Sequence, residues 1–215
     1  MNPDIKAILW DFGGVFTTSP FDAFARYEQQ NGLPDRFLRT VNAQNKDTNA
    51  WARLERSELT ADEFDALFAD ESEALGHRIP GKDVLGLLSG DFRPAVISAL
   101  KVCKQHYKVG CITNNAPTGK GASMADSDEK AKLAHSVMAE FDHVIESSKA
   151  GVRKPDPKIY QMMCDALDVA PEHCVFLDDL GINLKPARAM GMTTIKVLSE
   201  EQLLHDLAEA VCLEF

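Results

Sequence analysis

The sequence predicts a doubly wound α/β protein in which a helical segment interrupts a parallel sheet. Five short apolar runs are continuous rather than alternating, which is typical of strands buried on both faces. Helical patterns separate the last four runs, so we expect parallel strands joined by crossover helices. The first two runs stand about a hundred residues apart, far more than one crossover helix needs. Together these observations favour a Rossmann-like sheet that carries an inserted domain.

The apolar spacing locates each element of this sheet in turn. Strands are expected at residues 7–10, 109–112, 143–145, 174–177 and 194–197. Helical spacing predicts helices from Pro94 to Gln105 and from Pro157 to Leu167. The sequence Ser-Glu-Glu-Gln from Ser199 predicts a capping box at the start of a last helix. Trp10 stands inside a strand and is expected in the core.

The long interval after the first strand is helical in pattern rather than loop-like. Apolar residues recur at helical spacing from Phe21 to Phe24 and from Phe37 to Val41, and Thr60 begins a capped helix. The predicted domains are a core of residues 1–17 and 91–215 and an inserted helical domain of residues 18–90. A stretch rich in Gly and Ser, residues 117–127, is expected to be a flexible surface loop.

Composition excludes several classes of protein. The chain has 215 residues, of which 45% are hydrophobic and 26% charged, so a disordered chain or a coiled coil is not expected. Its formal net charge is −10, which argues against nucleic acid and anionic membranes as partners. No apolar run approaches the roughly 20 residues that span a bilayer.

The cysteines and the N-terminus predict where the protein resides. The five cysteines form no Cys-x-x-Cys pair, and most stand in apolar runs, as buried thiols do. The N-terminus leads directly into a strand-like segment without the features of a signal peptide. These features favour a reducing, cytoplasmic location.

Polar side chains stand where the predicted strands end. Asp11 follows the first strand, Thr113 the second, Lys154 comes after the third, and Asp178 and Asp179 follow the fourth. Ligands of open parallel sheets bind beyond these carboxyl ends. Three carboxylates at one edge require a positive partner, and a few hard oxygen ligands favour Mg²⁺.

The order of these motifs resembles a known superfamily. Asp-x-x-x-Val at 11–15, Thr-Asn at 113–114, Lys-Pro-Asp-Pro at 154–157 and Asp-Asp at 178–179 resemble the haloacid dehalogenase-like (HAD) hydrolases. Residues 175–188 are similar to the branch that contains the phosphatase domain of soluble epoxide hydrolases and the HAD-like domain of an acyl-CoA dehydrogenase family protein. The resemblance covers essentially the whole chain and implies a Rossmann-like HAD core with an inserted alpha-helical cap.

The resemblance implies catalytic roles for residues that handle the phosphoryl group. Asp11 matches the nucleophile that forms an aspartyl-phosphate. Thr113 matches the hydroxyl that orients the transferring group, and Asn114 adjoins it as a substrate contact. Lys154 matches the lysine that holds the nucleophile and offsets phosphate charge. Its neighbour Arg153 is expected to be solvated.

The resemblance also implies a magnesium site. Asp11, the carbonyl of Gly13 and Asp179 match the metal ligands, and Asp178 matches a neighbouring contact to metal or water. Asn183 matches a polar residue that steadies this acidic loop. Phosphoryl transfer needs this combination of a nucleophile, a cation and a positive clamp.

One position departs from the family's phosphatase motif, Asp-x-Asp. Gly13 stands where the second Asp would protonate the leaving alkoxide, a function whose loss costs about 10²–10⁴-fold in rate. Three explanations stay open: a substrate such as an acyl or anomeric phosphate, another acid, or a catalytically impaired binding domain. A cap residue or water could supply the acid; the candidates nearest in sequence are Thr17, Thr18 and Asp22.

A dehalogenase is a further alternative, because halide leaves without a proton. Dehalogenases of this superfamily need no Mg²⁺, however, and the Asp178-Asp179 pair argues for a metal. The sequence therefore predicts a Mg²⁺-dependent phosphatase that acts on a small organic phosphate monoester. It is expected to be a monomer or homodimer whose partner is a small phosphorylated molecule.

Overall fold

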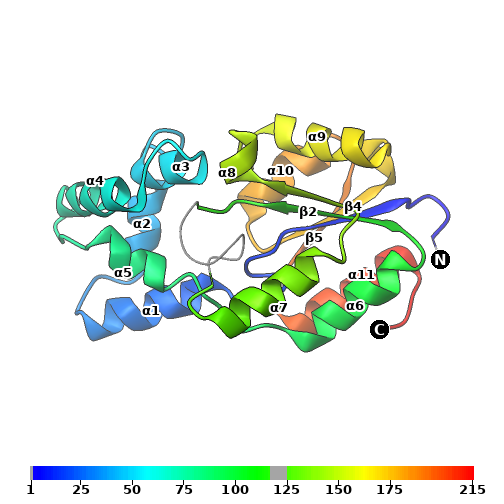
Figure 1. Cartoon of the computed structure of the whole chain (residues 1–215), viewed down its shortest axis with the longest axis horizontal. Coiled ribbons are helices and arrows are strands. Elements are labelled where there is room, and N and C mark those ends of the chain that lie inside the picture. The colour runs from blue at the N-terminus through cyan, green and yellow to red at the C-terminus, as the bar shows by residue number, and fades with distance from the viewer. Residues whose placement is uncertain (1, 117–124) are drawn as a thin grey trace.

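The computed structural model describes residues 2–116 and 125–215 and contains a five-stranded parallel sheet (Figure 1). The strands are β1 (Ala7–Trp10), β2 (Lys108–Thr113), β3 (His143–Glu146), β4 (Cys174–Asp178) and β5 (Thr193–Lys196). Their order is β3-β2-β1-β4-β5, with every neighbouring pair parallel. The predicted strands are confirmed, and β5 begins and ends one residue early. The predicted flexible loop lies outside the described residues over 117–124.

Helices follow the strands as the apolar spacing predicts. Between β1 and β2 lie α1 (Pro20–Gln30), α2 (Phe37–Ala43), α3 (Ala50–Glu55), α4 (Ala61–Glu73), α5 (Gly81–Gly86) and α6 (Pro94–Lys104). The rest of the chain adds α7 (Asp128–Met138), α8 (Ser147–Ala150), α9 (Pro157–Leu167), a 3-10 turn at Pro171–His173, α10 (Gly181–Ala189) and α11 (Glu200–Val211).

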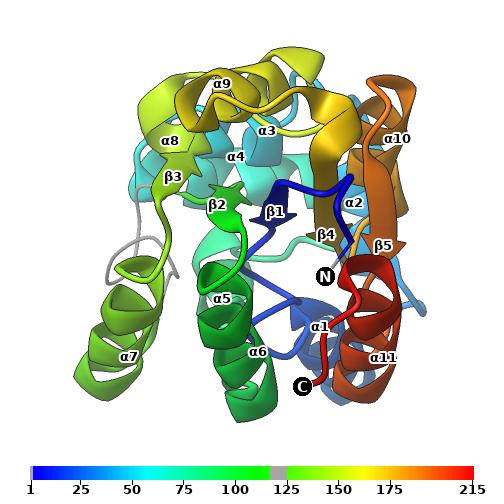
Figure 2. The ribbon, with the colours of Figure 1, turned by 90° about the vertical axis from the view of Figure 1, so that its right-hand side faces the viewer.

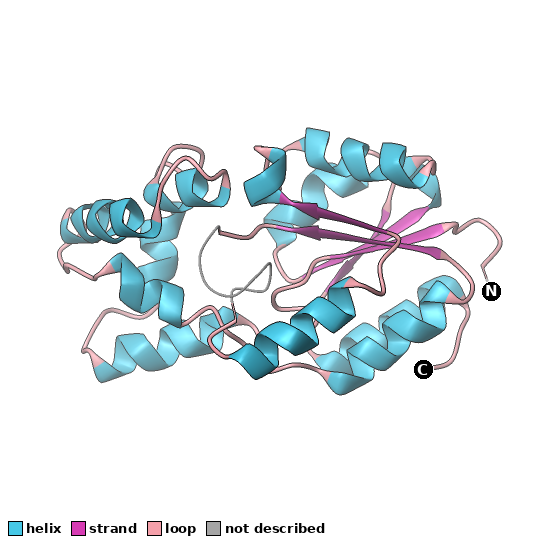
Figure 3. Cartoon of the chain, in the orientation of Figure 1, coloured by secondary structure: helices cyan, strands magenta, loops and turns pink. Residues whose placement is uncertain are grey.

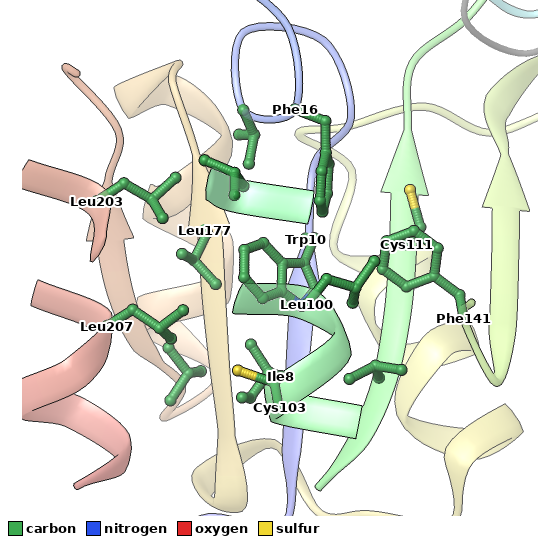
Figure 4. Close-up of a cluster of buried hydrophobic side chains, with 14 of the residues drawn as sticks. Ile8, Trp10, Phe16, Leu100, Cys103, Cys111, Phe141, Leu177, Leu203 and Leu207 are labelled. Carbon is green, nitrogen blue, oxygen red and sulfur yellow. The ribbon is translucent and has the colours of Figure 1, made fainter. Parts of the chain in front are cut away.

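The sheet is covered on both faces, as a doubly wound fold requires (Figure 2). Helices α9 and α10 pack on one face, and α6, α7 and α11 pack on the other. Trp10 of β1 is fully buried on the face that α6, α7 and α11 cover, near Leu100 and Leu177 (Figure 4). Its ring lies 5.2 Å from that of Phe16, which confirms its predicted place in the core.

Helices α1–α5 form a separate lobe with an apolar cluster of its own. Phe24, Leu38, Phe64 and Phe68 are buried in it, and Trp51 packs against Phe64 with ring centroids 5.6 Å apart. These aromatic side chains give the short helices a shared core, which such helices need in order to be stable. The domain boundaries at residues 17/18 and 90/91 stay a prediction.

The two predicted helix starts differ in detail. At α4, the Thr60 side chain caps Glu63 and the Glu63 carboxylate returns to Thr60, so the capping box is complete. At α11, Ser199 caps the amide of Gln202, but the Gln202 side chain accepts from Leu198 instead. The capping box predicted at Ser199 is therefore only half formed.

The strands run toward the lobe of α1–α5, so their carboxyl ends face it (Figure 3). Strand β1 lies in the centre, and Trp10 is in register with Cys111 of β2 and Leu177 of β4. The residues that follow these three positions therefore meet at one edge of the sheet.

The structure bears on two predictions, the burial of the cysteines and the lack of a membrane-spanning segment. Four of the five cysteines are buried, as expected, whereas Cys212 is exposed, and no disulfide joins cysteines in the described residues. Among those residues, none of the helices has the length and apolarity needed to cross a membrane.

Candidate active site

Lys154 joins two carboxylates at the carboxyl edge of the sheet. Its Nζ lies 2.8 Å from Asp11 Oδ1 and 2.8 Å from Asp178 Oδ2. The side chains of Lys154 and Asp178 are 1% and 0% exposed, and that of Asp11 is 10% exposed. The structure thus brings together three residues that are far apart in the sequence. Asp11 and Asp178 are separated by 167 positions.

Asp178 has hydrogen-bond partners on both oxygens. Its Oδ1 accepts from the Leu180 amide at 2.8 Å and from Asn183 Nδ2 at 3.0 Å. Its Oδ2 accepts from Asn183 at 3.1 Å as well as from Lys154. The Tyr160 hydroxyl in turn donates to the Asn183 carbonyl at 2.7 Å. Asn183 therefore steadies the acidic loop, and Asp178 fixes the lysine.

Asp179 lies beside the loop that follows β1. Its Oδ2 accepts from the Ser19 hydroxyl at 3.2 Å. A Cβ built on Gly14 would lie 2.3 Å from this oxygen, and the φ of Gly14 is +74°. Only glycine fits this turn without strain, because both the space and the backbone conformation exclude a side chain.

The Gly13 backbone belongs to the same loop, and its environment differs from that of Gly14. A Cβ built on Gly13 would meet no atom within 4 Å. Arg93, the residue before α6, donates from Nη1 to the carbonyl of Gly14 at 2.9 Å and holds this loop. Packing therefore does not require a glycine at position 13.

Thr113 and Asn114 end β2 next to Lys154. Thr113 is 3% exposed. The Asn114 side chain accepts from the Lys154 amide at 2.9 Å and donates to the Lys154 carbonyl at 3.0 Å. Asn114 thus holds the backbone of Lys154, while its predicted contact with substrate stays a prediction.

The electrostatics of this edge are dominated by buried negative charge. Burial raises the pKa of Asp11 well above its usual value, repulsion from Asp178 and Asp179 adds to this, and Lys154 opposes it. Burial and the charge of Asp178 raise the pKa of Asp179 to about 6. Burial alone would lower the pKa of Lys154, but the two carboxylates outweigh it and raise that pKa. Lys154 therefore stays protonated.

The donor set at this edge fits a divalent cation. Asp11, Asp178 and Asp179 each offer a carboxylate oxygen, and these oxygens lie within 4.8 Å of one another. Lys154 compensates one of the three charges. Among residues 2–116 and 125–215, Asp11 Oδ2 and Asp179 Oδ1 accept no hydrogen bond. Hard oxygens in this number match the preference of Mg²⁺.

A cavity of about 400 Å³ lies between this edge and the lobe of α1–α5. Asp11, Thr113, Lys154 and Asp179 line it from the sheet. From the lobe, it is lined by Phe21, Phe24, Arg39, Trp51, Leu54 and Glu55. The sheet-edge wall, called the floor below, is charged, whereas the wall formed by the lobe is largely apolar.

Three residues of this site have roles that sequence reasoning missed. Arg153 is not solvated as expected: its side chain is 20% exposed and its Nε lies 2.6 Å from Glu55 Oε2. Glu55 itself is buried, and Ser19 reaches Asp179. Each contact joins the lobe to the sheet across long sequence separations, so no local pattern marks it.

Of the residues named as substitutes for the missing acid, only one lines this cavity. Thr17 is buried there, and its hydroxyl accepts from the Gly14 amide at 3.3 Å. Thr18 and Asp22 line a separate, smaller hollow near Arg26.

A family model for haloacid dehalogenase-like hydrolases matches residues 5–191. The chain belongs to this family. The HAD-like fold and the hydrolase class expected from the motifs are thereby confirmed.

Curated relatives support the expected branch of this HAD-like family. The chain is 30% identical over 208 residues to acyl-CoA dehydrogenase family member 10 of Mus musculus, and 30% over 215 residues to bifunctional epoxide hydrolase 2 of Sus scrofa. These matches cover 94% of this chain but only 19% and 38% of the relatives. A D-ribitol-5-phosphate phosphatase of Bacteroides thetaiotaomicron is 26% identical over 89% of this chain and 91% of its own.

Solved structures share the fold of this HAD-like chain. A HAD family enzyme of Bacteroides thetaiotaomicron, in complex with magnesium and inorganic phosphate, has a TM-score of 0.56 at 20% identity. The match covers 89% of this chain and 93% of that enzyme's chain. An L-2-haloacid dehalogenase of Xanthobacter autotrophicus has a TM-score of 0.59 at 18% identity, covering 97% and 84%. A HAD family enzyme that binds magnesium and phosphate and a haloacid dehalogenase thus share the architecture.

Proposed function

We propose that the protein is a Mg²⁺-dependent phosphatase that hydrolyses a small organic phosphate monoester through an aspartyl-phosphate on Asp11. One observation carries the proposal: the Asp11–Lys154–Asp178 contacts, at 2.8 Å each, lie beside Asp179 on the floor of a cavity. A carboxylate nucleophile, a fixed cation and a further cation site are the groups that phosphoryl transfer requires. The phosphatases among the relatives support the same reaction class.

Each residue of the floor has a part in the proposed reaction. Asp11 attacks phosphorus, the ester P–O bond breaks, and the alcohol leaves. Lys154 keeps Asp11 in position and offsets charge on the phosphate oxygens, while the Thr113 hydroxyl orients the group. Water then attacks the phosphorus and releases phosphate, which restores the Asp11 carboxylate.

The proposed metal site uses Asp11, the Gly13 carbonyl and Asp179, with Asp178 as a neighbour. Mg²⁺ bound there would neutralise charge that develops on the phosphoryl oxygens. The buried carboxylates of Asp11 and Asp178 and the half-buried one of Asp179 share one lysine. This supports the proposal, because a cation would offset the burial and the repulsion from Asp178 that raise the pKa of Asp179.

Helices α1–α5 are proposed to act as the cap that selects the substrate. The lobe supplies the aromatic and apolar part of the cavity, whereas the sheet edge supplies the charged part. A small phosphorylated molecule is therefore the proposed partner of a monomer or homodimer in the cytoplasm. Neither nucleic acid nor membrane is a proposed partner of a chain with a net charge of −10.

The test is a hydrolysis screen of phosphate esters, acyl phosphates, sugar 1-phosphates and 2-haloacids, with and without Mg²⁺. We expect Mg²⁺-dependent phosphate release that Asp11→Asn abolishes and that Asp35→Asn, at an exposed carboxylate of the lobe, leaves intact. Halide release that a chelator does not affect would replace the proposal with a dehalogenase. No turnover despite Mg²⁺ binding would indicate a binding domain.

A further inference from the structure

Glu55 is a buried carboxyl group without a role in the reaction proposed above. It is the last residue of α3 in the lobe, and only 7% of its surface is exposed. It lines the same cavity as Asp11, Thr113 and Lys154. A buried carboxyl is costly to retain unless it has partners, so its contacts indicate what holds it there.

Three neighbours hold the Glu55 side chain. Trp51 Nε1 donates to Oε1 at 3.0 Å, and Asn114 Nδ2 lies 3.5 Å from Oε2. Arg153 Nε lies 2.6 Å from Oε2, yet its N–H is not aligned for a hydrogen bond and has no other partner among the described residues. Oε2 thus lies against two side chains of the sheet edge, those of Arg153 and Asn114.

Glu55 and Asp11 line the same cavity from different walls, Glu55 from the lobe and Asp11 from the sheet edge. Asp11 attacks from the floor, so the leaving oxygen must depart away from the floor, toward the lobe. Glu55 belongs to the lobe wall of the cavity, and Asn114 links it to the backbone of Lys154, whose Nζ contacts Asp11.

We propose that Glu55 donates the proton to the leaving oxygen, in place of the acid that the chain lacks at Gly13. This inference rests on the phosphatase function proposed above. As Asp11 bonds to phosphorus and the P–O bond breaks, its electron pair goes to the leaving oxygen, which takes the Glu55 proton. The products are an alcohol, the aspartyl-phosphate and the Glu55 carboxylate.

The second half of the reaction returns the proton. Water attacks phosphorus, the P–O bond to Asp11 breaks, and the Glu55 carboxylate takes a proton from the water. Phosphate and the Asp11 carboxylate are released, and Glu55 is again protonated. Glu55 thus acts first as general acid and then as general base.

Opposing effects act on the pKa of Glu55. Burial is the largest and raises it, whereas the charges of Arg153 and Lys154 and the hydrogen bond from Trp51 lower it. The lobe offers the cavity one other carboxyl within the described ranges, Asp47, which is exposed on the loop before α3. Thr17 offers only a hydroxyl, a far weaker acid than a carboxyl group.

The test is the dependence of rate on the leaving group in wild type and Glu55→Gln. Glutamine keeps the shape but carries no acidic proton, and its amide nitrogen cannot accept from the donor that faces it. The quantity compared is kcat/KM, which reports the steps up to departure of the leaving group and leaves out hydrolysis of the aspartyl-phosphate. With an alkyl phosphate, whose alkoxide must be protonated, we expect kcat/KM to fall by about 10²–10⁴-fold. With p-nitrophenyl phosphate, whose phenolate leaves unprotonated, we expect little change in kcat/KM. Equal losses of kcat/KM on both substrates, or no loss on either, would overturn the inference.

Two controls separate folding and specificity from proton transfer. Glu58→Gln, at an exposed carboxylate three residues away, should behave as wild type on both substrates. Gly13→Asp introduces a carboxyl into open space and should restore alkyl phosphate turnover to Glu55→Gln. Failure of this rescue, in a folded double variant that still cleaves p-nitrophenyl phosphate, would count against proton donation by Glu55.

The wild-type series is informative even if Glu55→Gln does not fold. Across aryl phosphates, a shallow dependence of kcat/KM on leaving-group acidity is expected, and a steep one would overturn the inference. The proposed function fails separately: it falls if Asp11→Asn retains turnover, whatever Glu55→Gln does. If wild type cleaves no phosphate ester, the function and the inference fall together.

Discussion

The two walls of the cavity are built on different principles. On the floor, short motifs at strand ends place carboxylates and a lysine, and Asp178 alone accepts from Lys154, Asn183 and Leu180. On the lobe side, aromatic and aliphatic faces of α1–α3 dominate, and Arg39 stacks on Phe21 at 4.1 Å from the ring centroid. The floor carries the charged groups that the proposed chemistry needs, whereas the lobe is the part proposed to select the substrate.

Removing the positive charge of Lys154 from the floor is expected to have the largest effect. Lys154→Met leaves Asp11 and Asp178 buried without their partner, so we expect about 3–5 kcal/mol less free energy of unfolding together with loss of activity. Urea unfolding without metal measures this. Lys149→Met, which removes a lysine whose side chain is 76% exposed, should cost less than about 1 kcal/mol. Equal effects of the two variants would contradict a special role for the floor.

Magnesium should stabilise the floor and act through Asp179. At a concentration 100-fold above its dissociation constant, a bound ion adds about 2.7 kcal/mol to the free energy of unfolding. The pKa of Asp179, about 6 without metal, means that protons compete with Mg²⁺ as the pH falls through this value. The stabilisation should therefore shrink below pH 6 and be lost in Asp179→Asn, as thermal unfolding can show. A shift that survives in Asp179→Asn would place the ion elsewhere.

The two glycines after Asp11 should respond differently to the same added methyl group. Gly14→Ala would place an alanine at a positive φ with its Cβ against Asp179. We therefore expect the free energy of unfolding to fall by about 1–3 kcal/mol and Mg²⁺ to bind more weakly. Gly13→Ala fills open space, so its stability should change by less than about 0.5 kcal/mol. Unfolding and Mg²⁺ titration of both variants measure the difference, and a reversed order would show that the loop geometry is wrong.

The smallest effect is expected on the lobe side. Arg39→Gln removes a cation that stacks on Phe21 and lines the cavity, which is worth about 0.5–1 kcal/mol at an exposed site. Its free energy of unfolding should change little, whereas KM should change more than kcat. A loss in kcat with unchanged KM would mean that Arg39 belongs to the chemistry rather than to substrate choice.

The floor could be predicted from the sequence because parallel strands collect their ends at one edge. Once β1, β2 and β4 were placed, Asp11, Thr113 and Asp178 had to lie together. The contacts of the lobe were not predictable in this way. Ser19 reaches Asp179 and Glu55 reaches Arg153 only because α1–α5 pack over the sheet edge, which no local period encodes. For the same reason Arg153 pairs with Glu55, where its sequence context predicts a solvated side chain.

The nucleophilic role of Asp11 can be tested by trapping its phosphorylated form. The enzyme, turning over a phosphate ester with Mg²⁺, is quenched with borohydride, which reduces an acyl phosphate to an alcohol. Peptide mass spectrometry should then find homoserine in place of Asp11, and none in Asp11→Asn or without substrate. Turnover that leaves Asp11 unmodified, or modification of another carboxylate such as Asp178 or Glu55, would contradict the proposed mechanism.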